Sequence, residues 1–204
     1  MLAKKIIFRI REVFRTPYVY DSGTSFDADH GIDTERINDR NIVRRVYRRL
    51  RGFSNYQALP VQYLSQIRKI LLTSELKTLV DIGSGKGCVL FYLRDMFDYL
   101  IGVEYFQDLH ELAIFNAKVL NTTNIEFVNI DASCYRLPSN PCVVFIFNPF
   151  GEKVMTDFLT ANLDLVTKDY LFIYVNPVAL HVFEEFGFRS CATDLQNLIT
   201  LRKL

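Results

Sequence analysis

Cysteine and histidine are scarce in this sequence, and they lie apart from one another. The 204 residues include four cysteines, none of them in the C-x-x-C spacing of a zinc or redox motif, and three histidines, His30, His110 and His181. No Ser-His-Asp, His-cluster or calcium-loop spacing is present. We therefore expect no bound metal ion, and reduced, mostly buried thiols of the kind usual in a cytoplasmic protein.

Long apolar runs, low-complexity linkers and internal repeats are missing as well. No apolar run approaches the ~20 residues that a membrane-spanning helix needs. Arg9 and Arg11 interrupt the apolar stretch at the N-terminus, so we expect no secretory signal and no transmembrane segment. Half of the residues are apolar, which is enough for a sizeable core. The sequence therefore predicts one domain over residues 1–204, with a helical cap region at 1–74 and a sheet at 75–204.

A strong net charge is also absent, because the formal total is only +1. The charge is uneven, however, since residues 1–51 contain 12 Lys/Arg and 7 Asp/Glu and the remainder is mildly acidic. Within this basic part, apolar periodicity predicts a helix at 35–51 with a basic face from Arg40 to Arg51. That face could hold a nucleic acid or an acidic protein partner, and the alternative is a face that contacts only solvent.

A glycine-rich turn is the most informative feature of the chain. An apolar strand pattern at 77–82 leads into Gly83, Gly85 and Gly87, and an apolar helical pattern follows. Such a turn brings backbone N–H groups and the positive end of a helix to a ligand, and glycine allows positive φ and close approach. The spacing is G-x-G-x-G, and Cys88 stands where the dinucleotide fingerprint G-x-G-x-x-G has its last glycine.

From residue 77 onward, strand patterns alternate with helical ones, which is typical of a mostly parallel α/β sheet with helices on both faces. The predicted strands are 77–82, 99–104, 125–130, 142–148 and 170–176, with a closing pair at 188–194 and 197–203. The predicted helices are 4–15, 35–51, 60–72, 86–95, 107–120 and 152–166. Residues 16–34 are rich in turn formers and are predicted as loop.

Polar residues end several of these strands. Glu104, Asp131 and Asn148 each follow an apolar run, and ligands of parallel sheets bind where the carboxyl ends of neighbouring strands diverge. A carboxylate at the end of the second strand can accept hydrogen bonds from both hydroxyls of a ribose. Dinucleotide enzymes share this acidic strand end, so Glu104 alone does not separate them from other nucleoside-binding proteins.

The glycine turn resembles the first motif of class I S-adenosylmethionine-dependent methyltransferases, in the stretch Val80-Asp81-Ile82-Gly83-Ser84-Gly85-Lys86-Gly87. The resemblance implies a seven-stranded sheet whose last strand is antiparallel, and S-adenosylmethionine as the cofactor. It makes Glu104 the ribose ligand, Tyr105 a neighbour of the adenine, and Asp131 with the Ala132 N–H the partners of the adenine edge. Within the motif, the implied cofactor-binding residues are Asp81, Gly83, Ser84, Gly85 and Gly87.

The exit of the fourth strand reads Asn148-Pro149-Phe150-Gly151. Many methyltransferases that act on amine or amide nitrogen carry Asn/Asp-Pro-Pro-Tyr/Phe here, and this chain departs from that pattern at Phe150 and Gly151. It is closer to a group of small bacterial methyltransferases, related to the non-SET histone-lysine enzymes, in which Asn-Pro-Phe is usual. The resemblance makes Asn148 the catalytic residue, facing both the cofactor's methyl group and the acceptor.

The N-terminal loop also resembles that bacterial group, through Phe26-Asp27 and Gly31-Ile32-Asp33-Thr34. In the group, an N-terminal loop partly covers the cofactor, and this implies that Asp33 and Thr34 touch its methionine end. The alternative is that Thr34 caps the helix that follows.

The leading hypothesis is therefore methyl transfer from S-adenosylmethionine to an acceptor that the sequence does not identify, with an amine nitrogen of a protein, an RNA or a small molecule favoured. No general base can be assigned. The first alternative is a non-catalytic module that binds nucleic acid or protein through the Arg40–Arg51 face. The second is an NAD(P)-dependent oxidoreductase, which shares the sheet and Glu104.

Overall fold

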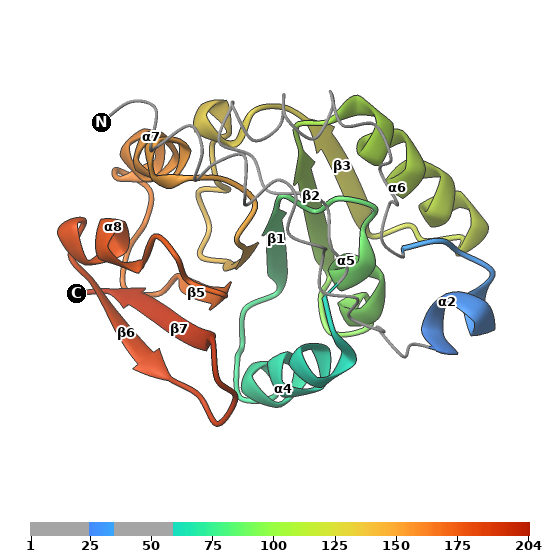
Figure 1. Ribbon diagram of the computed structural model, residues 1–204, viewed down its shortest axis with the longest axis horizontal. Coiled ribbons are helices and arrows are strands. Elements are labelled where there is room, and N and C mark those ends of the chain that lie inside the picture. The colour runs from blue at the N-terminus through green and yellow to red at the C-terminus, as the bar shows by residue number, and fades with distance from the viewer. Residues whose placement is uncertain (1–24, 35–58) are drawn as a thin grey trace, which may run out of the picture.

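The computed structural model describes residues 25–34 and 59–204, and it contains a sheet with helices against both of its faces (Figure 1). The helices predicted at 4–15 and 35–51 lie outside the described residues, and so does the basic Arg40–Arg51 face. No helix in the described ranges combines the length and the apolarity needed to cross a membrane.

The described residues form a seven-stranded sheet in the order β3-β2-β1-β4-β5-β7-β6. The five strands from β1 to β5 are parallel, and β7 runs antiparallel between β5 and β6, which confirms the predicted architecture. The order reverses between β1 and β4, which lie side by side. The strands are β1 (Thr78–Ile82), β2 (Tyr99–Glu104), β3 (Ile125–Asn129), β4 (Val143–Phe147), β5 (Leu171–Val175), β6 (Phe188–Ala192) and β7 (Leu198–Lys203).

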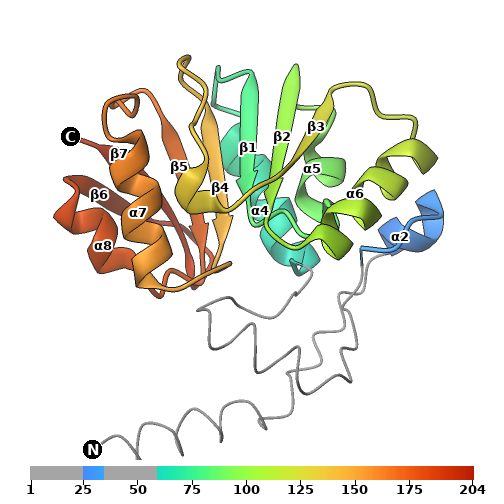
Figure 2. The same ribbon diagram turned by 90° about the horizontal axis from the view of Figure 1, so that it is seen from above.

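Helices cover the sheet on both sides (Figure 2), because successive side chains of a buried strand point to opposite faces. Leu79 of β1 packs with α4 and α5 on one face, and Val80 packs with α7 and α8 on the other. Both faces are apolar, so the central strands read as continuous hydrophobic runs. The helical elements are α2 (Ser25–His30), α4 (Val61–Leu71), α5 (Cys88–Leu93), α6 (Gln107–Val119), η1 (Ala132–Cys134), α7 (Glu152–Asn162) and α8 (Leu180–Glu185).

The helices differ from prediction in two places. Residues 25–30 form α2, so the prediction of a loop there was wrong, and α8 was not predicted. Each has six residues, too short for a periodic signal or for stability in isolation, so tertiary contacts decide its state. Phe26 of α2 packs against Tyr92 with ring centroids 5.7 Å apart, and α8 buries Phe183.

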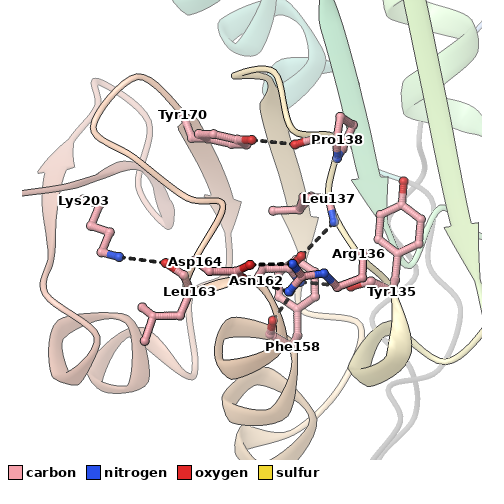
Figure 3. A network of polar contacts seen from close by, with 10 residues as sticks. All are labelled: Tyr135, Arg136, Leu137, Pro138, Phe158, Asn162, Leu163, Asp164, Tyr170 and Lys203. Carbon is pink, nitrogen blue, oxygen red and sulfur yellow. Dashed lines mark hydrogen bonds and ion pairs between the residues drawn. The ribbon is translucent and has the colours of Figure 1, made fainter.

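A buried asparagine links the loop before β4 to α7 through hydrogen bonds (Figure 3). Asn162 is fully buried, and its Oδ1 accepts a hydrogen bond from the Leu137 N–H at 2.7 Å. Its Nδ2 donates to the carbonyl of Tyr135 at 3.0 Å and to that of Phe158 at 2.9 Å. Because the loop leads directly into β4, these bonds help to set the position of the strand that ends at Phe147.

Asn162→Ala should lower the free energy of unfolding by about 2–4 kcal/mol, because it leaves the Leu137 N–H and the Tyr135 carbonyl buried without their partner. Urea unfolding followed by circular dichroism measures the loss. The matched control is Asn140→Ala, an exposed asparagine just before the same strand, which should leave stability unchanged. A loss of less than about 1 kcal/mol for Asn162→Ala would contradict the structural role.

Candidate functional site

The glycine turn after β1 is held tightly between β2 and β4. Gly83, Gly85 and Gly87 all have positive φ, at 81°, 55° and 88°. The N–H of Gly83 donates to the Val103 carbonyl of β2 at 2.8 Å. A Cβ added to Gly83 would lie 2.3 Å from Cβ of Pro149, so the turn after β4 touches the turn after β1. Only glycine fits at this contact.

Glu104, at the end of β2, is hydrogen-bonded to this turn. Its Oε2 accepts from the Gly85 N–H at 2.9 Å, and its Oε1 accepts from the Phe106 N–H at 2.7 Å. Glu104 is only 6% exposed, so the carboxylate is held in one orientation. Each carboxylate oxygen has two lone pairs, so an oxygen that accepts one N–H can also accept a ligand hydroxyl.

Asp81 is a strongly perturbed acid at this edge of the sheet. It is 2% exposed, and its carboxylate makes no hydrogen bond within the described residues. Burial, and secondarily the negative charge of Glu104, raise the pKa of Asp81 well above its usual range. A buried carboxyl group without a partner is energetically unfavourable, and a positively charged ligand group beside it would stabilise its ionised form.

Ser84, the second residue of the turn, has an orphaned hydroxyl. Its Oγ is buried and has no hydrogen-bond partner in the described part of the chain. It lies so close to β2 that a Cβ on Gly102 would sit 2.8 Å from it. Buried hydroxyls are normally paired, so a polar atom of a ligand would complete this group.

The residues after β3 offer a second polar edge. Oδ1 of Asp131 accepts from the N–H of Ser133 at 2.9 Å and from its hydroxyl at 2.7 Å, so Asp131 caps η1. Its Oδ2 and the Ala132 N–H have no such partner among residues 25–34 and 59–204. Tyr105, after β2, is 38% exposed and packs edge-on against Phe106.

Asn148 follows β4 and completes the set of strand ends. Its φ is 39°, in the left-handed region that non-glycine residues other than asparagine rarely adopt. Its side-chain amide makes no hydrogen bond to another described residue. The register pairs Ile82 with Val103 of β2 and with Ile146 of β4, so the turns after these strands gather at one edge of the sheet.

The N-terminal segment reaches the glycine turn through two residues that sequence reasoning did not single out. Asn116 of α6 is 1% exposed, and its Nδ2 donates to the carbonyls of Asp33 at 2.9 Å and Lys86 at 3.3 Å. The Lys86 ammonium, almost fully buried, pairs with Asp33 Oδ1 at 2.8 Å. Thr34 is buried, and its N–H and hydroxyl donate to the carboxylate of Asp27. Contacts between residues so distant in sequence leave no local pattern.

Neither a metal-binding cluster nor a cavity in the described residues points to a second site. No set of three or more His, Cys, Asp or Glu side chains there could hold a metal ion. An open cavity of about 410 Å³ lies between α2 and Tyr92, and one of about 610 Å³ lies between α6 and the edge strand β3. Neither is lined by the polar residues at the strand ends.

The fold is that of the class I S-adenosylmethionine-dependent methyltransferases, as comparison with solved structures shows. A ribosomal protein L11 methylase from Lactobacillus delbrueckii subsp. bulgaricus is 15% identical, with 70% of this chain and 79% of that chain covered and a TM-score of 0.53. A putative rRNA methylase from Clostridium thermocellum is 15% identical, with 74% and 98% covered and a TM-score of 0.54.

A third similar structure contains a ligand. It is a SAM-dependent methyltransferase from Thiobacillus denitrificans in complex with S-adenosyl-L-homocysteine, 17% identical, with 66% of each chain covered and a TM-score of 0.50. No protein-family model matches this sequence, and the search of curated proteins gives no match. The narrower resemblance to non-SET histone-lysine enzymes is not tested by these structures and stays a prediction.

Asn116→Leu should loosen the segment 32–34 from the glycine turn without unfolding the sheet, because the substitution removes the hydrogen bonds made through this side chain and leaves the Lys86–Asp33 ion pair. Hydrogen exchange measured by mass spectrometry should show faster exchange in peptides that cover 25–34 and unchanged exchange in β4 and β5. Lys118→Ala, an exposed change on the same helix, serves as the control. Unchanged protection of the segment in Asn116→Leu would contradict the role of this contact.

The raised pKa of Asp81 predicts a specific dependence of stability on pH. Above about pH 4 the unfolded chain loses this proton first, so the free energy of unfolding falls as the pH rises toward the raised pKa of the folded state. Asp81→Asn lacks this contribution, so its stability relative to wild type should increase over that interval. Urea unfolding at a series of pH values tests this, with the exposed Asp98→Asn as control. A pH-independent difference would contradict the prediction.

Proposed function

We propose that this protein is an S-adenosylmethionine-dependent methyltransferase. The observation that carries the proposal is the hydrogen bond between the Glu104 carboxylate and the Gly85 N–H, which joins the acid at the end of β2 to the glycine turn after β1. The Ser84 hydroxyl, which has no hydrogen-bond partner among the described residues, lies at the same edge, and the strand order reverses there, where open α/β sheets bind their ligands.

The cofactor would lie across the ends of β1, β2 and β3. Glu104 would accept the ribose hydroxyls, and Gly83, Gly85 and Gly87 would let the backbone approach the ligand. Oδ2 of Asp131 and the Ala132 N–H form an acceptor–donor pair that suits the amino group and ring nitrogen of adenine, with Tyr105 beside the ring. Asp81 is the buried acid with a raised pKa that suits the positively charged methionine end, and Ser84 and Thr34 lie in the two segments that would enclose that end.

The chemistry requires positioning more than activation. When bound, the cofactor supplies a methyl group attached to a sulfonium. As the acceptor's lone pair bonds to the methyl carbon, the carbon–sulfur bond breaks and the sulfur leaves as a neutral thioether. The carbonyl of the Asn148 side chain would accept a hydrogen bond from the acceptor nitrogen and aim its lone pair along the line of displacement. The acceptor must arrive unprotonated, and the proton that it loses after transfer would pass to solvent.

The alternatives have less support. A dinucleotide enzyme would place glycine where this chain has Cys88, whose side chain is buried against the core on α5. Among the described residues the buried Asp81 carboxyl and the Ser84 hydroxyl have no hydrogen-bond partner, and a purely structural domain gains nothing from them, because both reduce stability unless a ligand satisfies them. Binding of nucleic acid or protein at the Arg40–Arg51 face remains compatible with methyl transfer as a contact for the acceptor.

S-adenosylhomocysteine should bind the wild-type protein and raise its thermal stability. At a ligand concentration 100 times Kd, the gain is about 2.7 kcal/mol. Glu104→Gln should weaken binding about 10- to 100-fold, because hydrogen bonds to a charged group are worth about 1.5–3 kcal/mol. Isothermal titration calorimetry measures both affinities, and Glu111→Gln on α6 is the control.

The same titration with NADH tests the alternative function, an NAD(P)-dependent oxidoreductase. Binding of NADH and no binding of S-adenosylhomocysteine would overturn the proposed function in favour of an oxidoreductase. Circular dichroism of Glu104→Gln is required beside the calorimetry, since the glycine turn depends on this side chain. A folded variant with weakened binding supports the assignment, and a folded variant with wild-type affinity contradicts the role of Glu104.

A further inference from the structure

A second asparagine stands beside Asn148 at the same edge of the sheet, and we propose that it binds the methyl acceptor. Asn176-Pro177 follows β5 just as Asn148-Pro149 follows β4. Both asparagines adopt left-handed backbone conformations, with φ of 51° and 39°. The inference rests on the proposed function and deepens it, because it assigns an acceptor-positioning residue and a class of acceptor.

The strand register brings the two asparagines together. Phe147 of β4 pairs with Val175 of β5, so the next residue on each strand leaves the sheet at the same level. Neighbouring strands lie about 4.8 Å apart, which places Asn148 and Asn176 side by side. Pro149 touches the glycine turn at Gly83, whereas β5 lies one strand further from it. An acceptor that approaches the methyl group along β4 therefore passes Asn176.

The backbone holds Asn176 rigidly while its side chain stays open. Its N–H donates to the Asn197 carbonyl, before β7, at 2.7 Å, and its carbonyl accepts from the Val178 N–H at 2.8 Å. The side chain is exposed, and its amide makes no hydrogen bond to any residue in 25–34 or 59–204. A fixed backbone that presents an unused donor and acceptor is suited to positioning a ligand, since little conformational freedom is lost on binding.

A left-handed asparagine is by itself only a turn former, and this chain has others. Asn121 has the same φ of 51° as Asn176, but it lies in the turn that precedes β3, at the opposite end of the parallel strands. What distinguishes Asn176 is its place next to Asn148. Asn121 therefore provides a matched control with the same backbone conformation and no part in the site.

The residues around Asn176 favour an amine at the end of an aliphatic arm, rather than a nucleobase, as the methyl acceptor. Recognition of an unstacked base generally uses an exposed aromatic ring. Where β4 and β5 leave the sheet, the aromatic residues Phe150 and Tyr174 are buried, at 4% and 0% exposure, and the partly buried Phe147 packs against the core. The exposed apolar side chain there is Val178, at 57%. Val178 would contact methylene groups, and the amide oxygen of Asn176 would accept a hydrogen bond from an N–H of the neutral amine of the arm.

The test uses an adenosyl amino acid in which nitrogen replaces the sulfonium, bearing either a methyl group or an aminopropyl arm. Calorimetry gives the affinity gained through the arm as the ratio of the two dissociation constants. Asn176→Gly keeps the backbone conformation accessible and should reduce this gain about tenfold. Asn176→Asp should restore it, because a carboxylate also accepts a hydrogen bond from the amino group of the arm. Asn121→Gly should leave it unchanged.

The outcomes are distinguishable. If S-adenosylhomocysteine binds but Asn176→Gly keeps the full gain from the arm, Asn176 does not position the acceptor. If the wild-type protein binds an analogue whose arm carries a purine base more tightly than it binds the aminopropyl analogue, the acceptor is a nucleobase and the amine class is wrong. If S-adenosylhomocysteine does not bind wild type at all, the proposed function fails and this inference fails with it.

Discussion

The close contact between the glycine turn and its neighbours is the constraint on which the rest of the site depends. Gly83 lies against Pro149 on one side, and its N–H is bound to the end of β2 on the other. A side chain at Gly83 would separate β1 from β4 at the point where the strand order reverses. Because this contact brings three strand ends together, the carboxylate of Glu104 and the amide of Asn148 share one edge of the sheet.

The polar groups near this turn carry an energetic cost that the core does not require. Asp81 is buried with a raised pKa, and the Ser84 hydroxyl is buried without a partner in the part of the chain that the structure describes. Asn116 and Lys86, by contrast, are buried and satisfied, and they join the N-terminal segment to the turn. The unsatisfied groups belong to the strand end and turn of the proposed site and the satisfied ones support it, a division expected where a binding site takes precedence over local stability.

Much of the fold could be predicted from the sequence because the signals are local. The central strands are apolar runs bounded by turn residues, and each predicted strand from 77–82 to 197–203 has a counterpart in the sheet. The strand-end residues Glu104 and Asn148 were recognisable because a polar residue stands out after such a run. The short helices α2 and α8 were missed, because six residues are held in a helix by tertiary packing such as that of Phe26 on Tyr92.

By itself, the sequence determined the alternation of strands and helices, the positive-φ turn at its three glycines, and the polar residues that end the strands, since each depends on neighbours along the chain. The tertiary structure alone decided which strand ends adjoin. The contact of Asn116 with Asp33 spans 83 residues, and the adjacency of Asn148 and Asn176 follows from the pairing of β4 with β5. Strand register is a non-local property, set by packing over the whole sheet, and no single stretch of sequence contains it.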